Sequence, residues 1–333
     1  MTLEGLPPAA RSRAVRASQP SWVPPMLATL TEKRFSDPAW LYERKLDGER
    51  CLAFREGRAV GLMSRNQLRI DNHYPEVAEA LVVQPRSRFI VDGEIVAFDR
   101  GRPSFARLQR RMQLRDPEAA RRTGVRVYFY VFDVLHAQGF DVTRVELRHR
   151  KAILRNLLSY GGPLRFTTHR VRAGEALLQK ACGEGWEGVI AKRADSPYVH
   201  RRSPDWLKFK CVNEQEFVIG GFTDPKGSRT GFGALLIGYY EGGRLAYAGK
   251  VGTGFDAVLL GSLSKELSRL ERKEPPFDDG PLPRKGVHWV EPELVCEIGF
   301  AEWTRDGQLR HPRFLGLRED KSPGDVVRER PQS

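Results

Sequence analysis

Short runs of β-branched and aromatic residues follow one another along the first part of the chain, and this pattern predicts strands. Residues 52–63 form two apolar runs on either side of Glu56-Gly57, which predicts a hairpin. Residues 88–99 form two apolar runs around Asp92-Gly93-Glu94, closed by a turn. Residues 125–135 are rich in β-branched and aromatic side chains, which predicts a buried strand.

Helices are predicted between these strands. Thr143 and Glu146 have the spacing of a capping box at the start of the helical pattern that runs to residue 158. Residues 174–183 give a second helix, and residues 186–193 return to a strand. The first part of the chain therefore combines strands and helices, as an α+β domain does.

The last 120 or so residues repeat the strand pattern with one helix. Residues 206–222 lead out of the first region, and a hairpin is predicted at Glu241-Gly242-Gly243. Residues 255–270 have apolar positions at helical spacing. Short strands with a single helix predict a small β-barrel of the OB type.

Charge divides the chain at the same place. The chain of 333 residues has a net charge of +13, with 55 Lys and Arg against 42 Asp and Glu. Residues 213–333 hold 17 of the basic and 19 of the acidic side chains, so the excess positive charge lies in residues 1–212. A positive domain is typical of proteins that bind a polyanion such as nucleic acid.

These patterns predict three parts: a flexible basic arm over residues 1–20, a first domain over residues 21–212 and an OB-fold domain over residues 213–333. No apolar run is long enough to span a membrane, and we expect no signal peptide. The four cysteines lack metal spacing, so we expect reduced thiols in a cytoplasmic protein.

Charged motifs stand at the ends of the predicted strands. They are KLDGER (45–50), SRNQ (64–67), VDGE (91–94), VFD (131–133), EGVIAK (187–192), LKFK (207–210) and REDK (318–321). Lysine and arginine neutralise phosphate oxygens, and carboxylates bind divalent metal ions. This combination favours phosphoryl or nucleotidyl transfer. The chain has no Walker A sequence, so a P-loop NTPase is disfavoured.

The order of these motifs resembles that of the covalent nucleotidyltransferases, and most closely the ATP-dependent DNA ligases. The resemblance runs from about residue 25 to residue 322, and residues 225–240 resemble the ligase module of prokaryotic end-joining ligases. It implies an adenylation domain of antiparallel sheets and helices followed by the OB-fold barrel. One departure is Gln67, at a position where the family usually has glycine.

The resemblance also implies roles for residues around the first motif. Lys45 would be the nucleophile that takes AMP from ATP, and Asp47 would shape the turn and orient the lysine. Glu43 would accept a hydrogen bond from the adenine amino group, and Phe132 would stack on the base.

Further roles concern phosphate and metal. The resemblance implies that Arg50 and Arg65 contact the nucleotide or the 5′-phosphate of a nick, and that Lys208 and Lys210 hold the α-phosphate as catalytic residues. Four more residues are expected to contact ATP or Mg²⁺ or Mn²⁺, namely Glu94 (ribose or metal), Glu187 (metal) and the nucleotide-binding Lys192 and Lys321. Arg318, with Asp320 and Lys321, would swing over ATP from the second domain and orient pyrophosphate.

The expected function is that of a monomeric, nucleoid-associated ATP-dependent DNA ligase that seals nicked duplex DNA, with a Ku-like end-binding protein as a partner. Three alternatives stay open. An RNA ligase and an RNA-capping guanylyltransferase use the same lysine chemistry. A non-catalytic DNA-binding protein on a ligase scaffold would bind DNA without forming a lysine adenylate.

Overall fold

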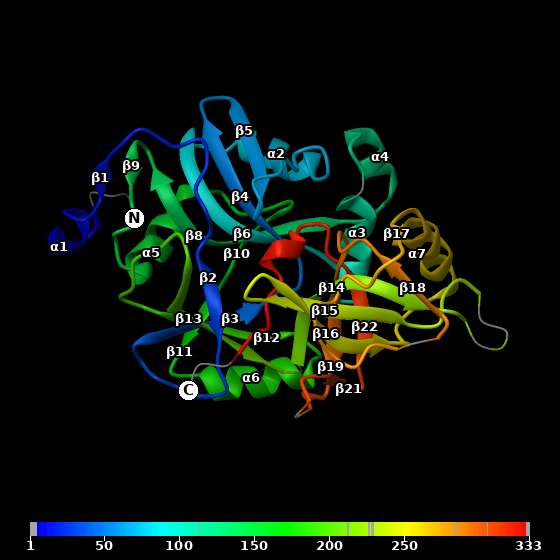
Figure 1. Cartoon of the computed structure of the whole chain (residues 1–333). Coiled ribbons are helices and arrows are strands. Elements are labelled where there is room, and N and C mark those ends of the chain that lie inside the picture. The colour runs from blue at the N-terminus through cyan, green and yellow to red at the C-terminus, as the bar shows by residue number, and fades with distance from the viewer. Residues whose placement is uncertain are drawn as a thin grey trace. The chain divides into compact units, whose positions relative to one another are not determined.

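The computed structural model describes residues 5–330 except 113, 212, 226, 228, 229, 284 and 305, and it divides into two compact units (Figure 1). Unit 1 is Met1–Cys211 and unit 2 is Val212–Arg330. Each unit has its own hydrophobic core, and each is described here by itself.

A large, mostly antiparallel sheet forms the body of unit 1. Its strands run in the order β1-β9-β8-β6-β4-β5, and β10 and β7 pair with β8 and β6. The bounds are β1 (Val15–Arg16), β4 (Glu49–Glu56), β5 (Ala59–Ser64), β6 (Arg88–Asp99), β7 (Arg102–Pro103), β8 (Val127–Ala137), β9 (Phe140–Asp141) and β10 (Leu164–Phe166).

A smaller sheet lies beside it in the same unit. Its order is β11-β3-β12-β13-β2, antiparallel except for β13 with β2. The bounds are β2 (Leu27–Leu30), β3 (Trp40–Lys45), β11 (His169–Val171), β12 (Gly188–Arg193) and β13 (Arg202–Lys210).

Helices cover the outer faces of both sheets. Buried residues of α2 (Pro75–Val82), α3 (Phe105–Met112) and α5 (Leu147–Leu157) pack on one face of the large sheet. Those of α6 (Gly174–Gly183) pack on the small sheet. A separate cluster joins the inner faces: it contains Phe54 of β4, Phe132 of β8 and Trp206 of β13. The inner faces of the two sheets of unit 1 therefore meet in this cluster.

The predicted hairpin and helices are present with small differences. Strands β4 and β5 pair antiparallel around Gly57. Strand β6 is continuous, whereas two runs were expected around Asp92, because β4 and β8 pair with it on both sides. The capping box at α5 is wrong: the Glu146 N-cap makes no side-chain cap bond, and Thr143 Oγ1 donates to Asp141 instead, at 2.7 Å.

The expected flexible arm is also wrong for residues 5–20, whereas residues 1–4 lie outside the described part. Helix α1 (Pro8–Arg11) and strand β1 form in this segment, and β1 pairs with β9. Leu6 and Ala10 are buried in the core of unit 1, which burial of apolar surface explains. The basic side chains of this segment thus lie on a folded edge of the domain.

Unit 2 is an antiparallel sheet with one long helix. Its main order is β16-β15-β14-β18-β17, and β19 pairs with both β14 and β22. The bounds are β14 (Asn213–Thr223), β15 (Leu235–Glu241), β16 (Arg244–Val251), α7 (Ala257–Arg269), β17 (Glu271–Arg272), β18 (Val287–Val290), β19 (Val295–Phe300), β20 (Glu302–Trp303), β21 (Leu309–Arg310), β22 (Arg313–Leu317) and the 3₁₀ turn η2 (Pro323–Asp325). The short α4 (Pro117–Arg122) belongs to unit 1.

One expectation about the cysteines is wrong. Cys182, in the last turn of α6, forms a disulfide with Cys211, the first residue after β13. Cys51 and Cys296 are free and buried. The pair could not be predicted from spacing, because the two cysteines are 29 residues apart and only the fold brings the end of β13 to the end of α6. Among the described helices, none has the length and apolar character needed to cross a bilayer.

Candidate active site

Strand alternation in the small sheet separates a core face from a chemical face. Tyr42, Val189 and Phe209 point to the outer face and pack with α6. Their neighbours in sequence therefore point to the inner face, because side chains alternate along a strand. That inner face carries Glu43 and Lys45 of β3, Lys192 of β12, and Trp206, Lys208 and Lys210 of β13.

The register aligns these residues across three strands. Gly188 pairs with Lys45 on one side and with Lys210 on the other. Ile190 pairs in the same way with Glu43 and Lys208. Lysines that are about 165 residues apart in sequence are thus two strand spacings apart, roughly 10 Å. Three of the predicted motifs, KLDGER, EGVIAK and LKFK, thus meet on one rung of the sheet.

Gly188 permits this close register. Its φ is +151°, and a Cβ at this position would lie 2.0 Å from the carbonyl oxygen of Phe209. Any side chain would push β12 away from β13. The glycine of the EGVIAK motif therefore has a packing reason, in addition to its place beside Glu187.

Lys45 ends β3 and enters the turn of the KLDGER motif. Its Nζ donates to Oε1 of Glu187, the residue before β12. Oε2 of Glu187 accepts no hydrogen bond from the described residues. Gly48 is required in the turn, since a Cβ there would lie 2.1 Å from the carbonyl oxygen of Ile95 and 3.1 Å from Cγ of Glu94. The turn thus brings Gly48 of the KLDGER motif against Glu94 of the VDGE motif.

Glu43 is buried between two lysines. Lys192 Nζ lies 2.7 Å from its Oε2, and Lys151 Nζ of α5 lies 2.5 Å from its Oε1. Burial raises the pKa of Glu43, but the charges of Lys151 and Lys192 outweigh burial and hold that pKa below its ordinary value. Burial also lowers the pKa of Lys192. Glu43 is therefore an ionised carboxylate inside the domain.

Phe132 faces this cluster from the large sheet. Lys192 Nζ lies 4.0 Å and Arg50 Cζ 4.7 Å from its ring centroid, and the Trp206 ring packs edge-on at 6.0 Å. Only 9% of Phe132 is exposed. Its stacking on adenine stays a prediction, since cations and the Trp206 ring already contact it.

Arg50 is held in place by the protein itself. Its Nε and Nη2 donate to the two carboxylate oxygens of Asp92, each at 2.5 Å, and Nη2 also donates to the carbonyl of Met26. Tyr198 donates to the same Asp92 at 2.7 Å. This fork–fork pair joins KLDGER to VDGE, so Arg50 has a structural role beside its predicted phosphate contact.

Arg65 follows β5 in a tight turn. Ser64 pairs with Cys51, so Arg65 comes next to the Arg50 position. Gln67, the departure from the family pattern, has a φ of +64°. A glycine would adopt this left-handed conformation without cost. The glutamine keeps the same turn, in which the backbone N–H of Gln67 donates to the carbonyl of Ser64.

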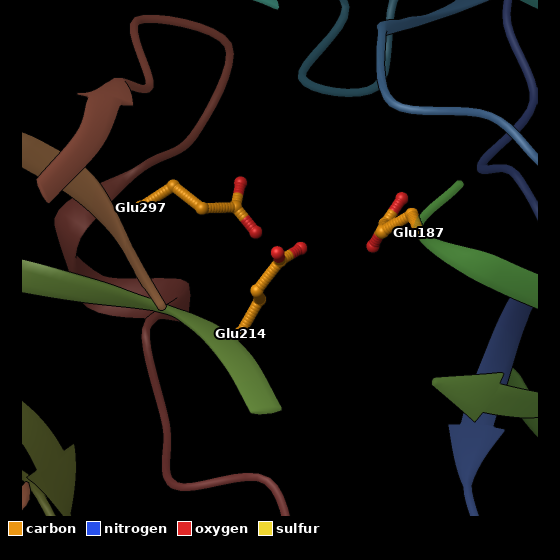
Figure 2. Close-up of side chains that lie close together, drawn as sticks. All are labelled: Glu187, Glu214 and Glu297. Carbon is orange, nitrogen blue, oxygen red and sulfur yellow. The ribbon is translucent and has the colours of Figure 1, made fainter. Parts of the chain in front are cut away.

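The REDK motif is held within unit 2. Arg318 donates through Nε and Nη2 to Asp320, both at 2.9 Å, and through Nη1 to Glu297 of β19. Lys321 Nζ lies 3.0 Å from Glu216 of β14. Burial opposes both charges. The carboxylates of Asp320 and Glu297 nevertheless raise the pKa of Arg318, and Arg318 and Lys321 lower the pKa of Asp320. Figure 2 shows Glu297 of β19 beside Glu214 of β14, and these two strands pair antiparallel.

The residues present fit a divalent cation in unit 1. Glu187 keeps one carboxylate oxygen that accepts no hydrogen bond from the described residues, and Glu94 lies against the turn that carries Lys45. Carboxylate oxygens are the ligands that Mg²⁺ and Mn²⁺ prefer. Both residues were predicted as metal ligands, and that role stays a prediction.

Three buried partners of these residues were not predicted: Lys151, Asp92 and Tyr198. Asp92 stands in the VDGE motif, but nothing local indicates that it pairs with an arginine 42 residues earlier. Lys151 did leave a signal. It occupies a position of the buried stripe of α5, between Leu147 and Leu154.

Unit 1 therefore brings lysines and an acidic neighbour from the predicted motifs together at one sheet face, the arrangement that lysine-centred nucleotidyl transfer would need. Comparison with known families agrees. The family model described as ATP dependent DNA ligase domain matches residues 25–210, and the ATP dependent DNA ligase C terminal region matches residues 228–321. This chain belongs to the ATP-dependent DNA ligase family, and the expected α+β fold with an OB domain is confirmed.

Two curated relatives are named for non-homologous end joining. The chain is 41% identical over 324 residues to the multifunctional non-homologous end joining protein LigD of Pseudomonas aeruginosa, covering 95% of this chain and 38% of that protein. It is 38% identical over 314 residues to the LigD DNA repair protein of Mycobacterium tuberculosis, covering 92% and 40%. The chain thus spans about two fifths of the length of these relatives.

A solved structure supports the same assignment. The mycobacterial DNA ligase D complexed with ATP and MES superposes with a TM-score of 0.66 at 37% identity, covering 92% of this chain and 98% of that one. The resemblance to end-joining ligases that the motifs indicated is confirmed at the level of the family.

Proposed function

We propose that the chain seals 5′-phosphate/3′-hydroxyl nicks in duplex DNA, using ATP and a lysine adenylate on Lys45, as the ligase module of an end-joining system. The observation that supports this most directly is the register of three neighbouring strands, in which Gly188 pairs with both Lys45 and Lys210, together with the contact from Lys45 Nζ to Glu187. The relatives named above add the context of double-strand break repair.

In the first step, Lys45 Nζ bonds to the α-phosphorus of ATP while the bond from that phosphorus to the bridging oxygen breaks and pyrophosphate leaves. The ammonium must lose its proton before attack. Lys208 and Lys210 carry positive charge on the same sheet face, and like charge favours the neutral amine. The same two lysines stabilise the negative charge of the reacting phosphate. Glu187 orients Nζ through the contact described above.

A divalent cation held by Glu94 and Glu187 would neutralise charge on the triphosphate. Asp47 shapes the turn behind Lys45. Glu43 accepts a hydrogen bond from the adenine amino group, and Phe132 and Lys192 line the base. Arg318 and Lys321 exchange their carboxylate partners for pyrophosphate oxygens during this step alone.

In the second and third steps, the 5′-phosphate of the nick takes AMP from Lys45, and the 3′-hydroxyl then attacks that phosphate and expels AMP. Arg50 and Arg65 bind the 5′-phosphate. The positive charge of residues 1–212 binds the DNA backbone, so affinity falls steeply with salt concentration. We further propose that the protein acts as a monomer at the nucleoid, with a Ku-like protein at DNA ends.

The test begins with intact-protein mass after pyrophosphate treatment and incubation with Mg²⁺ and ATP, GTP or NAD. We expect one adenylate, from ATP alone, mapped to Lys45. Lys45→Ala should abolish it, whereas Lys180→Ala, which removes an exposed lysine of α6, should not. Formation of the adduct by Lys45→Ala would show that Lys45 is not the nucleophile.

Two substrate comparisons test the rest. Nicked DNA should be sealed faster than the same nick with RNA strands, and the reverse order would make the chain an RNA ligase. The cognate Ku-like protein should increase the joining of linear DNA ends without changing nick sealing. Equal end joining with and without it would remove Ku from the proposal.

A further inference from the structure

Lys151 is a buried lysine on a helix that carries none of the charged motifs. Only 2% of it is exposed, and it lies among the apolar residues of α5 that pack on the large sheet. Its Nζ donates to Glu43 Oε1 at 2.5 Å and to the carbonyl of Thr167 at 2.7 Å. Burying a lysine is costly unless it is paired, so this position is built around these two acceptors.

The two acceptors belong to different sheets. Glu43 stands on β3 of the small sheet, whereas the backbone amide of Thr167 donates to the carbonyl of Val131 on β8 at 2.9 Å. Val131 is next to Phe132 in the chain. Lys151 therefore fixes the distance between the carboxylate of Glu43 and the strand that carries Phe132. These are the two groups placed around the base in the proposed function.

Lys151 also controls which hydrogen bonds Glu43 can make. An ionised carboxylate only accepts hydrogen bonds, whereas a protonated one can also donate. Adenine presents an amino donor at its six position, and guanine presents a carbonyl oxygen there. A carboxylate held ionised by Lys151 and Lys192 thus accepts from adenine and repels the guanine oxygen.

We infer that Lys151 is a positioning residue that makes the site select ATP over GTP, by clamping the Glu43 carboxylate in the orientation that accepts the adenine amino group. This inference rests on the proposed function, in which Glu43 contacts adenine. Lys192 clamps the other oxygen, but it belongs to the EGVIAK motif and contacts Phe132 itself. Lys151 contacts Glu43, the Thr167 carbonyl and the ring of Phe166, and none of these three lies in a charged motif.

The test compares Lys151→Met with wild type in single-turnover formation of the lysine nucleotide adduct, at varied ATP, GTP and purine riboside triphosphate. The last nucleotide lacks the six-amino group. We expect the concentration for half-maximal rate with ATP to rise roughly tenfold, the loss of about one charge-assisted hydrogen bond. With purine riboside triphosphate it should change less than about twofold, and the preference for ATP over GTP should shrink.

The matched control is Arg148→Met, which removes an exposed cation from the same helix. Arg148→Met should leave the half-maximal concentrations of all three nucleotides unchanged. An equal loss with ATP and with purine riboside triphosphate in Lys151→Met would show a merely structural role and overturn the inference. An unchanged half-maximal ATP concentration would overturn it as well.

Glu43→Gln separates this inference from the proposed function. If Glu43→Gln raises the half-maximal concentrations of ATP and of purine riboside triphosphate by the same factor, Glu43 does not contact the amino group and its proposed role fails. If Glu43→Gln weakens the use of ATP more than that of purine riboside triphosphate, but Lys151→Met affects both equally, only the inference about Lys151 fails.

A double variant keeps the test valid if Lys151→Met alone folds poorly. Glu43→Gln/Lys151→Met removes one charge of each sign, so no buried carboxylate is left with only one of its two lysine partners. Because Lys151 acts through Glu43, the double variant should select nucleotides as Glu43→Gln does. A further loss of ATP selectivity in the double variant would contradict the inference.

Discussion

The disulfide between Cys182 and Cys211 should contribute a measurable part of the stability of unit 1. The two cysteines are 29 residues apart in sequence. Closing a loop of that length removes about 12 cal/mol/K of chain entropy from the unfolded state, or about 3.6 kcal/mol at 25 °C. For a domain of this size, that corresponds to a fall in Tm of about 7–14 °C when the bond is absent.

The perturbation is Cys182→Ser/Cys211→Ser, or a dithiol reductant added to the wild type. Neither cysteine is in the buried core, so serine replaces them without leaving a buried hydroxyl. We would follow thermal unfolding by circular dichroism with and without the reductant. The double variant should melt lower than oxidised wild type, and the reductant should not lower it further.

A thiol count fixes the starting state. Denatured wild-type protein should show two reactive thiols, Cys51 and Cys296, before reduction and four afterwards. Because the disulfide acts on the unfolded chain, lysine adenylate formation well below the Tm should be unchanged by the reductant. Four thiols before reduction, or an unchanged Tm after it, would refute the reasoning.

Three further predictions follow from single positions. Gly188→Ala should destabilise unit 1 by about 1–3 kcal/mol and slow adenylate formation, because the new Cβ meets the Phe209 carbonyl. The control Gly161→Ala, at a position with open space around it, should leave adenylation unchanged, as a rate assay on both variants would check. Gln67→Val should cost about 1–2 kcal/mol in a urea melt because a β-branched residue resists φ of +64°, whereas Gln67→Gly should stay within about 1 kcal/mol of wild type. The pKa of Glu43 lies below its ordinary value of 4.5, so its ion pairs stabilise the fold fully above that pH. This contribution is lost as pH falls through the lowered pKa. The free energy of unfolding, measured over an acid titration, should therefore fall less steeply for Glu43→Gln than for wild type.

Local pattern places the predicted site residues on strands, but it does not identify the residues that they pair with. Alternation along β3, β12 and β13 follows from local pattern, so the shared face of Lys45, Lys208 and Lys210 was accessible from motif positions. Which strand pairs with which was not, because pairing depends on contacts far apart in the chain. The Arg50–Asp92 fork is an example: both residues stand in recognised motifs, and only the fold unites them.

Two other differences have physical causes that a local pattern does not contain. The segment around Val15 is short and basic, and it forms a strand only because β9 offers it an edge. Lys151 breaks the apolar stripe of α5, and such a break was readable as a buried charge that needs a partner. Its partner, Glu43, lies 108 residues earlier and could not be identified from spacing.

The ion pairs of Arg318 have a consequence for product release. In the proposed role, its guanidinium binds pyrophosphate only by giving up Asp320 and Glu297, so the affinity for pyrophosphate is the difference between two sets of charged hydrogen bonds. Such a residue stabilises the leaving group briefly and returns to its own carboxylates. In that role, the acidic neighbours of Arg318 would compete with pyrophosphate and so limit inhibition of the first step by its own product.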